Sequence, residues 1–345
     1  MAINLAEKYS GQIADKFTHE SFVQGNVYTG YEFAGAKTVN IYTPITVALN
    51  DYDRTASGNR FGIVQEMQDS VQALELTQDK SFSLAIDKGN KEDQMGVKAG
   101  ARMLNMEIKE QAVPLMDMWA LNKFNLTAGK RAAIEAPTKD TVTEMIFNGA
   151  AALDNALVPT DNRVCYITSS VYNMLRLSKE FVGVDRLGEA ALAKGVVGMA
   201  ADMKLVKVPD SYMDAYFICT HKNSVIAPIK IKTARILTEA AGIDGVLLEG
   251  RYYFDAYTIG AKAGGVYAAV KSATVVADPV ITTNGSAHSV TAVGGVTFYY
   301  TLDGSDPRYN KAAKVYSAAV TPKAGEIFKV AGQNAAGAWS GVSTK

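Results

Sequence analysis

The spacing of hydrophobic positions changes several times along the first quarter of the chain. Over 4–22, apolar side chains recur at helix-like intervals between charged residues, which predicts an amphipathic N-terminal arm. From 38–49 the apolar period shortens to two and Pro44 interrupts it, which indicates an edge strand with a broken ladder. The polar segment 50–60 predicts an exposed loop, and 81–86 is a second extended run. Together these segments predict one long β-arm.

The most helical pattern lies at 92–124, where apolar residues step by three or four. At ~1.5 Å per residue such a helix is about 45 Å long, and we expect Pro114 to kink it. Its methionines could form a partner-binding groove, but apolar residues at helical spacing favour core packing. They are Met95, Met103, Met106, Met116 and Met118.

The next segments alternate between helix and strand. A helix is predicted over 139–157, with Thr138 or Asp140 as its cap. A buried strand follows at 163–168, and then a helix at 169–177 that is capped by serine. This alternation predicts an α+β body.

Glycines and strands complete this body. A bend is expected around Gly195 and Gly198, and 251–270 predicts a pair of apolar strands that closes the first domain near Val276. Three further strands are predicted between them, at 204–208, 216–220 and 224–236.

The tail, 277–345, shows short alternating runs separated by turn residues, which is typical of a small β-sandwich. We expect Phe298, Tyr300 and Trp339 to supply its core. The acidic segment 303–307 could suggest a calcium loop, but it lacks the other spaced oxygen ligands, which favours a tight turn.

The length and composition of the chain limit its number of domains and its possible classes of function. The 345 residues exceed what one core usually serves, so a large domain plus a module is expected. Lys and Arg total 35 and Asp and Glu total 35, which disfavours direct DNA binding because no strong positive field results. Glu7 and Lys8 stand where a signal peptide would need an apolar run, and no stretch predicts a bilayer span. Synthesis in a reducing cytoplasm is therefore expected.

The chain offers little reactive chemistry. Cys165 and Cys219 lie in apolar runs and are predicted to pack in the core. The histidines His19, His221 and His288 lie far apart, without the spacing of metal ligands.

Two further candidate sites have ordinary explanations. The glycines Gly260, Gly264 and Gly265 stand between strands and do not open a helix, so a phosphate cradle is disfavoured. Four carboxylates could act as acid and base, but they lie in polar runs that predict a solvated surface. They are Asp51, Asp53, Glu66 and Asp69. We therefore predict no catalytic residue, no cofactor and no metal site.

The order of the predicted elements resembles the major capsid proteins of tailed phages, the Hong Kong 97-type coat fold, over about 1–272. The series is an N-terminal arm, a long β-hairpin arm, a spine helix and an α+β body. Within the body the similarity rests on Leu157-Val158-Pro159 before the strand at 163–168, on KLVKVP and on GRYYFDAYTI followed by GGVYAAV. The resemblance implies an α+β coat domain at 1–276, divided into an arm at 1–30, an extended loop at 31–90 that reaches a neighbouring subunit, a spine helix at 92–125 and an axial domain at 137–245.

The same resemblance implies a structural role and no enzyme. The subunit would assemble into hexamers and pentamers of an icosahedral head that encloses DNA, with scaffolding, portal and decoration proteins as partners. It would meet the packaged DNA only by non-specific proximity, contact no membrane, assemble in the host cytoplasm and reside in the virion. No local motif fixes a lysine–asparagine cross-link, so that feature is not carried over.

The tail resembles the immunoglobulin-like module at the C-terminus of chitobiase-type enzymes, through FYYTLDGSDPR and the strands after it. This implies a sandwich at 277–345 that projects outward, makes weak glycan or host-surface contacts and is dispensable after Ala277. It also leaves an alternative open, a carbohydrate-acting enzyme or surface-binding protein, which as an enzyme would need two carboxylates flanking a sugar cleft.

Overall fold

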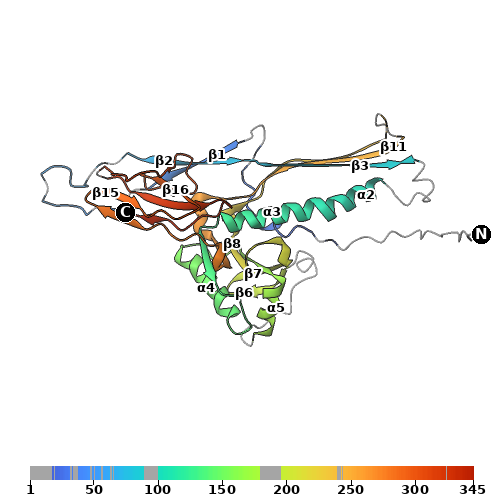
Figure 1. Cartoon of the computed structure of the whole chain (residues 1–345), viewed down its shortest axis with the longest axis horizontal. Coiled ribbons are helices and arrows are strands. Elements are labelled where there is room, and N and C mark those ends of the chain that lie inside the picture. The colour runs from blue at the N-terminus through green and yellow to red at the C-terminus, as the bar shows by residue number, and fades with distance from the viewer. Residues whose placement is uncertain are drawn as a thin grey trace, which may run out of the picture.

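The structure is a computed structural model that combines a long helix, an extended arm, a compact lobe and a C-terminal module (Figure 1). It describes residues 18, 20–31, 33, 38–46, 49, 51–55, 57–62, 64, 66–88, 100–178, 196–238, 242, 244–323 and 325–345. The predicted N-terminal arm at 4–22 lies mostly outside these residues, and 92–99, with Met95, and Gly195 lie wholly outside them.

The spine helix runs along the molecule and consists of α2 (Gly100–Glu107), the π-helical segment η2 (Ile108–Ala112) and α3 (Val113–Leu126). Pro114 occupies the first turn of α3. Proline lacks an N–H and clashes with the carbonyl four residues before it. The predicted disturbance at Pro114 therefore takes the form of a wider π-helical turn immediately before α3, from which the helix continues (Figure 1).

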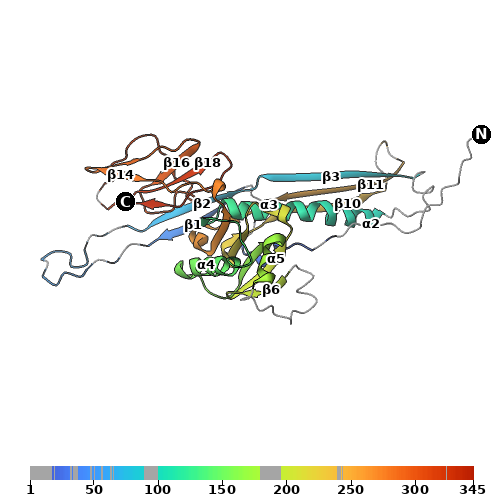
Figure 2. The ribbon, with the colours of Figure 1, turned by 60° about the horizontal axis from the view of Figure 1, so that its bottom comes forward.

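The predicted β-arm is two separate sheets. The hairpin consists of β1 (Thr38–Ile45) and β2 (Gln68–Glu75). The run at 81–86 lies in β3 (Gln78–Asp87), which pairs with β11 (Gly245–Phe254), and β11 pairs with β10 (Ile229–Leu237). We call this second sheet the arm sheet, and it lies along the spine helix in both views (Figure 2).

The prediction that Pro44 interrupts the β1 ladder is wrong, because Pro44 lies opposite Asp69 in continuous register. Each strand of a two-stranded sheet is an edge strand, where a missing N–H is tolerated.

The lobe contains a six-stranded sheet in the order β4-β13-β8-β5-β7-β6, covered by two helices. Its central strand β5 matches the predicted 163–168 and all its residues are buried. One core cluster joins the sheet to α3 through Leu121, Phe124 and Tyr166, and a second lies under α4 and α5. The elements are β4 (Lys130–Ile134), α4 (Val142–Asn155), β5 (Arg163–Thr168), α5 (Ser169–Leu177), β6 (Val196–Ala200), β7 (Met203–Val208), β8 (Phe217–His221) and β13 (Val266–Lys271).

Both predicted helix caps are wrong. The N-cap of α4 is Thr141, whose side chain makes no capping bond. The N-cap of α5 is Thr168, and the Ser170 N–H is bonded instead by the carboxylate of Asp210 at 3.0 Å. A carboxylate from a distant segment replaces the local cap, which local sequence cannot reveal.

One predicted bend and two predicted strand segments also need correction. Gly198 does not form a bend but lies in β6, at an irregularity in its pairing with β7. The strand predicted at 224–236 is divided at Pro228 into β9 and β10, because proline supplies no ladder N–H. The strand pair predicted over 251–270 is three strands, since β11 begins earlier and joins the arm sheet. The short elements are η1 (Gln24–Asn26), η3 (Asp210–Tyr212), η4 (Lys222–Ser224), β9 (Val225–Ile226), β12 (Tyr257–Thr258), η5 (Gly260–Gly265) and η6 (Ser272–Thr274).

The module, residues 277–345, is all-β, with a two-stranded sheet β14-β15 and a four-stranded sheet β17-β16-β18-β19. Its core consists of Val290, Phe298, Phe328 and Val330, with Tyr300 packed against it. Trp339 does not belong to this core: its ring contacts Tyr299, which alternates with the core residues of β16. The strands are β14 (Ile281–Asn284), β15 (Ala287–Val290), β16 (Val296–Thr301), β17 (Lys314–Val315), β18 (Lys329–Asn334) and β19 (Ser343–Thr344).

Candidate assembly surfaces

The end of the hairpin exposes apolar side chains on a polar turn. Tyr52 and Phe61 meet edge to face with ring centroids 5.1 Å apart, and Phe61 is 77% exposed. The Asp53 N–H donates to the Arg60 carbonyl at 3.1 Å, which closes the loop under these rings. We call this region the hairpin tip; Leu49, Val64 and Met67 are its other exposed apolar side chains. Apolar side chains grouped on a projecting element are typical of a contact surface.

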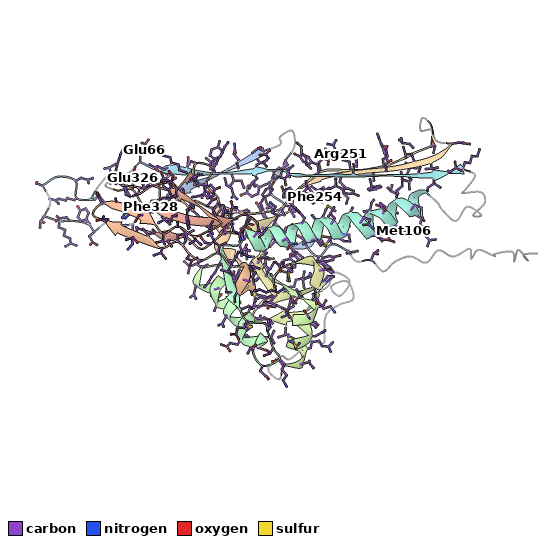
Figure 3. All side chains as sticks on the ribbon, viewed as in Figure 1. Glu66, Met106, Arg251, Phe254, Glu326 and Phe328 are labelled. Carbon is purple, nitrogen blue, oxygen red and sulfur yellow. The ribbon has the colours of Figure 1, made fainter. Side chains whose placement is uncertain are left out.

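A second apolar surface lies between the spine helix and the arm sheet. Met116 is buried against Tyr252 and Phe254, and a cavity of about 300 Å³ opens beside them. Figure 3 labels Phe254 and Arg251 on β11 and Met106 on the spine helix. Burial of Met116 here, and the contact of Met118 with the core cluster of α3, confirm core packing for those two methionines.

The lobe also exposes separate apolar side chains on or just after its helices. Leu157, just after α4, is 92% exposed and adopts a left-handed φ of 56°. Phe147 on α4 and Leu177 at the end of α5 are also exposed. The hairpin tip and the helices α4 and α5 lie on different parts of the molecule (Figure 1).

Two buried carboxylates hold the elements that carry these surfaces. Asp117 of α3 accepts hydrogen bonds from the Ser21 Oγ at 2.6 Å and the Phe22 N–H at 2.9 Å, which anchors the segment before η1. Asp255 accepts the Trp119 indole N–H at 2.8 Å, and the N–H and hydroxyl of Thr77 at 2.9 and 2.7 Å. Asp255 thus joins the spine helix, the β2–β3 connection and the end of β11. Sequence reasoning missed both; an acidic residue within an otherwise apolar run was the available signal.

The candidate reactive residues have structural roles. Cys165 and Cys219 lie opposite each other on β5 and β8, free and fully buried, which confirms their core packing. A hydrogen bond with Cys165, together with burial, raises the pKa of Cys219. His221 is buried, its Nδ1 accepts the Asn223 N–H at 3.2 Å, and burial lowers its pKa. Buried neutral thiols are poor nucleophiles and poor metal ligands.

His288 and His221 lie on different strands, β15 and β8. His288 lies on β15, with its Nδ1 3.1 Å from the Thr283 hydroxyl, and its ring packs on Phe328. His19 lies outside the described residues. Among the residues that the structure describes, no three His, Cys, Asp or Glu side chains gather as a metal site would require.

The glycines of η5 pack closely against neighbouring segments. A Cβ on Gly265 would lie 2.1 Å from the Ser224 Oγ, and one on Gly264 would lie 3.0 Å from the Ala156 Cβ. Gly260 likewise faces Tyr309. Their small size is required by packing, which accounts for them without a phosphate.

The four carboxylates considered for acid and base chemistry lie on or beside the hairpin, and all are exposed. Asp53 accepts the N–H and hydroxyl of Thr55 in a local turn. Figure 3 shows Glu66 at the hairpin, away from the lobe. Asp51, Asp53, Glu66 and Asp69 therefore form a solvated surface, as predicted.

The acidic segment at 303–307 forms a turn. The Asp303 Oδ1 accepts the N–H and hydroxyl of Ser305, at 3.0 and 2.6 Å, and Asp306 pairs with Arg308. Gly304 has a φ of +75°, which favours glycine. The oxygens that a calcium ion would need are thus engaged by the turn itself.

Solved structures with a similar fold come from phages. A chain of Mycobacterium phage Che8 superposes with a TM-score of 0.60 at 19% identity, covering 77% of this chain and 98% of that chain. A chain of the capsid of the cyanophage P-SCSP1u superposes with a TM-score of 0.60 at 12% identity, covering 78% of this chain and 93% of that chain. A chain of the mature capsid of bacteriophage PhiM1 superposes with a TM-score of 0.57 at 14% identity, covering 78% of this chain and 92% of that chain. The chain has a phage capsid fold.

Sequence comparison adds information only for the tail. The family described as Fn3 associated matches residues 289–345, within the all-β module. No curated protein matches the chain. Within the described part of the chain, no helix has both the length and the apolar character to cross a bilayer.

Proposed function

We propose that the chain is the major coat subunit of a tailed phage and assembles into the hexamers and pentamers of an icosahedral head around the DNA. The observation that carries this proposal is the capsid fold, which accounts for more than nine tenths of each of the compared phage chains. In this proposal the coat domain is 1–276 and follows the Hong Kong 97 type. Its arm is 1–30, its extended loop 31–90, its spine helix 92–125 and its axial domain 137–245.

The mechanism is repeated burial of apolar surface between identical subunits. The hairpin tip, with Phe61, reaches onto a neighbouring copy, and the exposed helix ends of the lobe, with Leu157 and Leu177, meet copies around the hexamer and pentamer centres. At ~25 cal/mol per Å² of apolar area, several such contacts offset the cost of association even when each is weak. Heterologous contacts of this kind close into rings.

The other parts of the proposal concern surroundings and partners. Scaffolding, portal and decoration proteins would assist assembly in the host cytoplasm, and the mature location would be the virion. The absence of net charge supports only non-specific proximity to the packaged DNA. The module would face the outer surface, where weak glycan contact stays a prediction.

The test is assembly of the expressed chain together with its assembly partners, followed by light scattering and electron microscopy. Phe61→Glu should abolish shells without changing the thermal unfolding of the subunit, because it places a charge in an apolar contact. Val293→Glu is the matched control, since Val293 is an exposed apolar residue of the module. The proposal would be contradicted by wild-type protein that stays monomeric, or by an equal loss of shells in the Phe61→Glu and Val293→Glu variants.

The alternative, a carbohydrate-acting enzyme, makes a different prediction. It requires hydrolysis of chromogenic glycosides that is lost when one carboxylate is changed. The exposed acids of the hairpin do not form the enclosed pair that such a reaction needs.

A further inference from the structure

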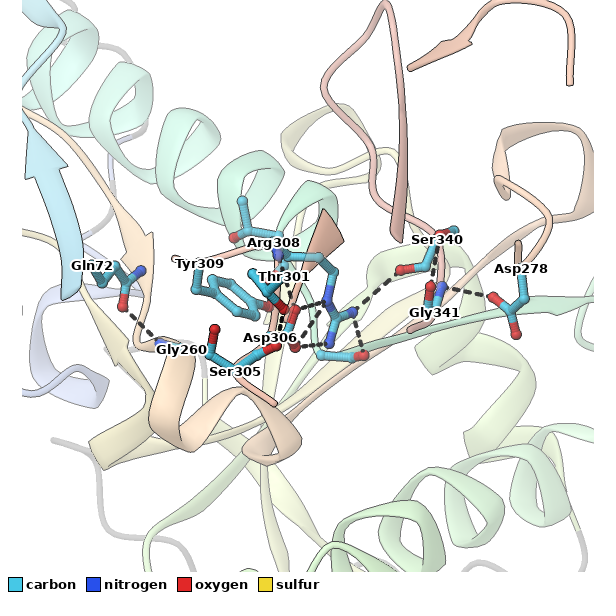
Figure 4. A network of polar contacts seen from close by, with 12 residues as sticks. Gln72, Gly260, Asp278, Thr301, Ser305, Asp306, Arg308, Tyr309, Ser340 and Gly341 are labelled. Atoms are coloured by element: carbon cyan, nitrogen blue, oxygen red, sulfur yellow. Dashed lines mark hydrogen bonds and ion pairs between the residues drawn. The ribbon is translucent and has the colours of Figure 1, made fainter. Parts of the chain in front are cut away.

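The module is attached to the rest of the chain by a buried polar seam (Figure 4). Arg308, whose side chain is 7% exposed, forms a forked pair with Asp306, with Nη2 2.7 Å from Oδ2 and Nε 3.0 Å from Oδ1. Its Nη1 donates to the Gly129 carbonyl at 2.8 Å, just beyond the spine helix, and to the Ser340 carbonyl at 3.3 Å. Burial alone would lower the pKa of Arg308, but Tyr309 and Asp306 raise it, so the guanidinium stays charged.

The next residues of the module reach the spine helix and the hairpin. The Tyr309 hydroxyl donates to the Thr127 carbonyl at 2.7 Å. The Lys311 N–H donates to the Val71 carbonyl of β2 at 2.8 Å. The hairpin is also held by the body of the chain, because the side chain of Gln72 on β2 accepts the N–H of Gly260 in η5 at 2.8 Å.

The fit at this seam is close. A Cβ on Gly260 would lie 2.5 Å from the Tyr309 Cβ, so the ring-bearing residue sits directly on the backbone of η5. Tyr309 and η5 are therefore closely packed, and neither can move far without displacing the other.

The connection into the module is fixed too. The Gly341 N–H donates to Asp278 at 2.7 Å, and the Ser343 hydroxyl donates to the Pro279 carbonyl at 2.6 Å. Val276, before them, is buried. These two bonds join the first residues of the module to its last segment, so the module is held to the body by the seam and by the short link at the buried Val276.

We propose that the module is an internal clamp that fixes the direction of the β1–β2 hairpin relative to the spine helix and the lobe. It bonds the carbonyls of Thr127 and Gly129 on one side and that of Val71 on the other, so rotation of the hairpin requires the seam to open. This inference concerns the chain by itself and does not depend on the proposed function. It opposes the expectation that truncation after Ala277 is harmless, because truncation would remove the Lys311 bond to Val71 and leave β2 held only by its contacts with the body.

The test is hydrogen exchange on the full-length chain, read at the Lys311 amide and in the β2 strand. Tyr309→Phe removes only the hydroxyl bond to Thr127. Gly260→Ala inserts a methyl group from the opposite side and leaves every residue of the module unchanged. The matched control is Tyr316→Phe, which removes a hydroxyl that accepts the Val290 N–H at 2.9 Å inside the module.

The clamp predicts that Tyr309→Phe speeds exchange of the Lys311 amide by about two- to tenfold, the loss of one hydrogen bond. Gly260→Ala should give a larger increase at Lys311. Exchange in β2 is compared only for Tyr309→Phe, because a Cβ on Gly260 would also lie 3.3 Å from the Gln72 Oε1 of that strand. Tyr316→Phe should change exchange at Val290 but not at Lys311. Unchanged Lys311 exchange in both seam variants, or an equal rise in the control, would overturn the clamp.

Discussion

Replacing Asp255 by asparagine tests whether a buried carboxylate holds the spine helix, the hairpin and the arm sheet together. Asp255 is 2% exposed and accepts four bonds. Its Oδ1 accepts the Trp119 indole and the Ala256 N–H, both at 2.8 Å, and its Oδ2 accepts both donors of Thr77. Asparagine keeps the shape but replaces one acceptor oxygen by an NH₂ group. Two donors therefore lose their acceptor, whichever way the amide is oriented.

The expected cost follows from those two bonds. Hydrogen bonds to charged groups contribute about 1.5–3 kcal/mol each. Because the two bonds share one carboxylate and are not independent, Asp255→Asn should lower the free energy of unfolding by about 3–5 kcal/mol. Asp79→Asn is the matched control: the same chemical change on the arm sheet, at an exposed carboxylate that pairs with Arg251 at 2.6 Å. Exposed pairs contribute little and are screened by salt.

The assay is urea unfolding of the purified chain, followed by circular dichroism at low and high salt. Asp255→Asn should shift the midpoint strongly at both salt concentrations. Asp79→Asn should shift it slightly, and only at low salt. Adding Trp119→Phe to Asp255→Asn should cost less than the sum of the two single changes, because the partners share one bond. Equal midpoints for the Asp255 and Asp79 variants would refute the role assigned to the buried carboxylate.

Three further outcomes are expected. Cys165 and Cys219 should resist a thiol reagent in the folded chain and react after denaturation, measured by absorbance, because both are fully buried. Burial lowers the pKa of His221, so its stabilising contribution should be complete above about pH 6.5 and be lost as pH falls through the lower folded pKa. His221→Gln should flatten that part of a plot of unfolding free energy against pH. Gly265→Ala should lower the thermal unfolding midpoint through about 1–3 kcal/mol of strain against Ser224, whether or not phosphate is added.

Elements with a strong local pattern could be predicted from the sequence. The strand Arg163–Thr168 and the helix Ser169–Leu177 have the bounds that the pattern predicted, because the strand has an apolar centre, Val164 to Ile167, and the helix is amphipathic. The spine helix ends within two residues of its predicted end at 124, since an unbroken apolar stripe leads to Leu126. Burial of the two cysteines followed from the same apolar runs.

Long-range pairing could not be predicted in the same way. Strand β3 pairs with β11, more than 150 residues away, and no local pattern encodes that register. The strand Gln68–Glu75 was missed because its outward positions are polar and its inward apolar residues are few. The strand Lys130–Ile134 was missed because it is short and lies at the edge of its sheet. These errors explain why one arm was predicted where there are two sheets.

The seam between the module and the body shows a deeper limit of sequence reasoning. Trp339 was assigned to the module core because a large aromatic residue in a small domain is expected there. Its ring instead meets that of Tyr299 edge to face, and its backbone N–H donates to the Leu126 carbonyl at 3.4 Å. The acceptors on the body side are backbone carbonyls, which every residue possesses and which leave no mark in the sequence. A docked module and a free one can therefore have similar sequences, and they differ in contacts such as that of Arg308 with the Gly129 carbonyl.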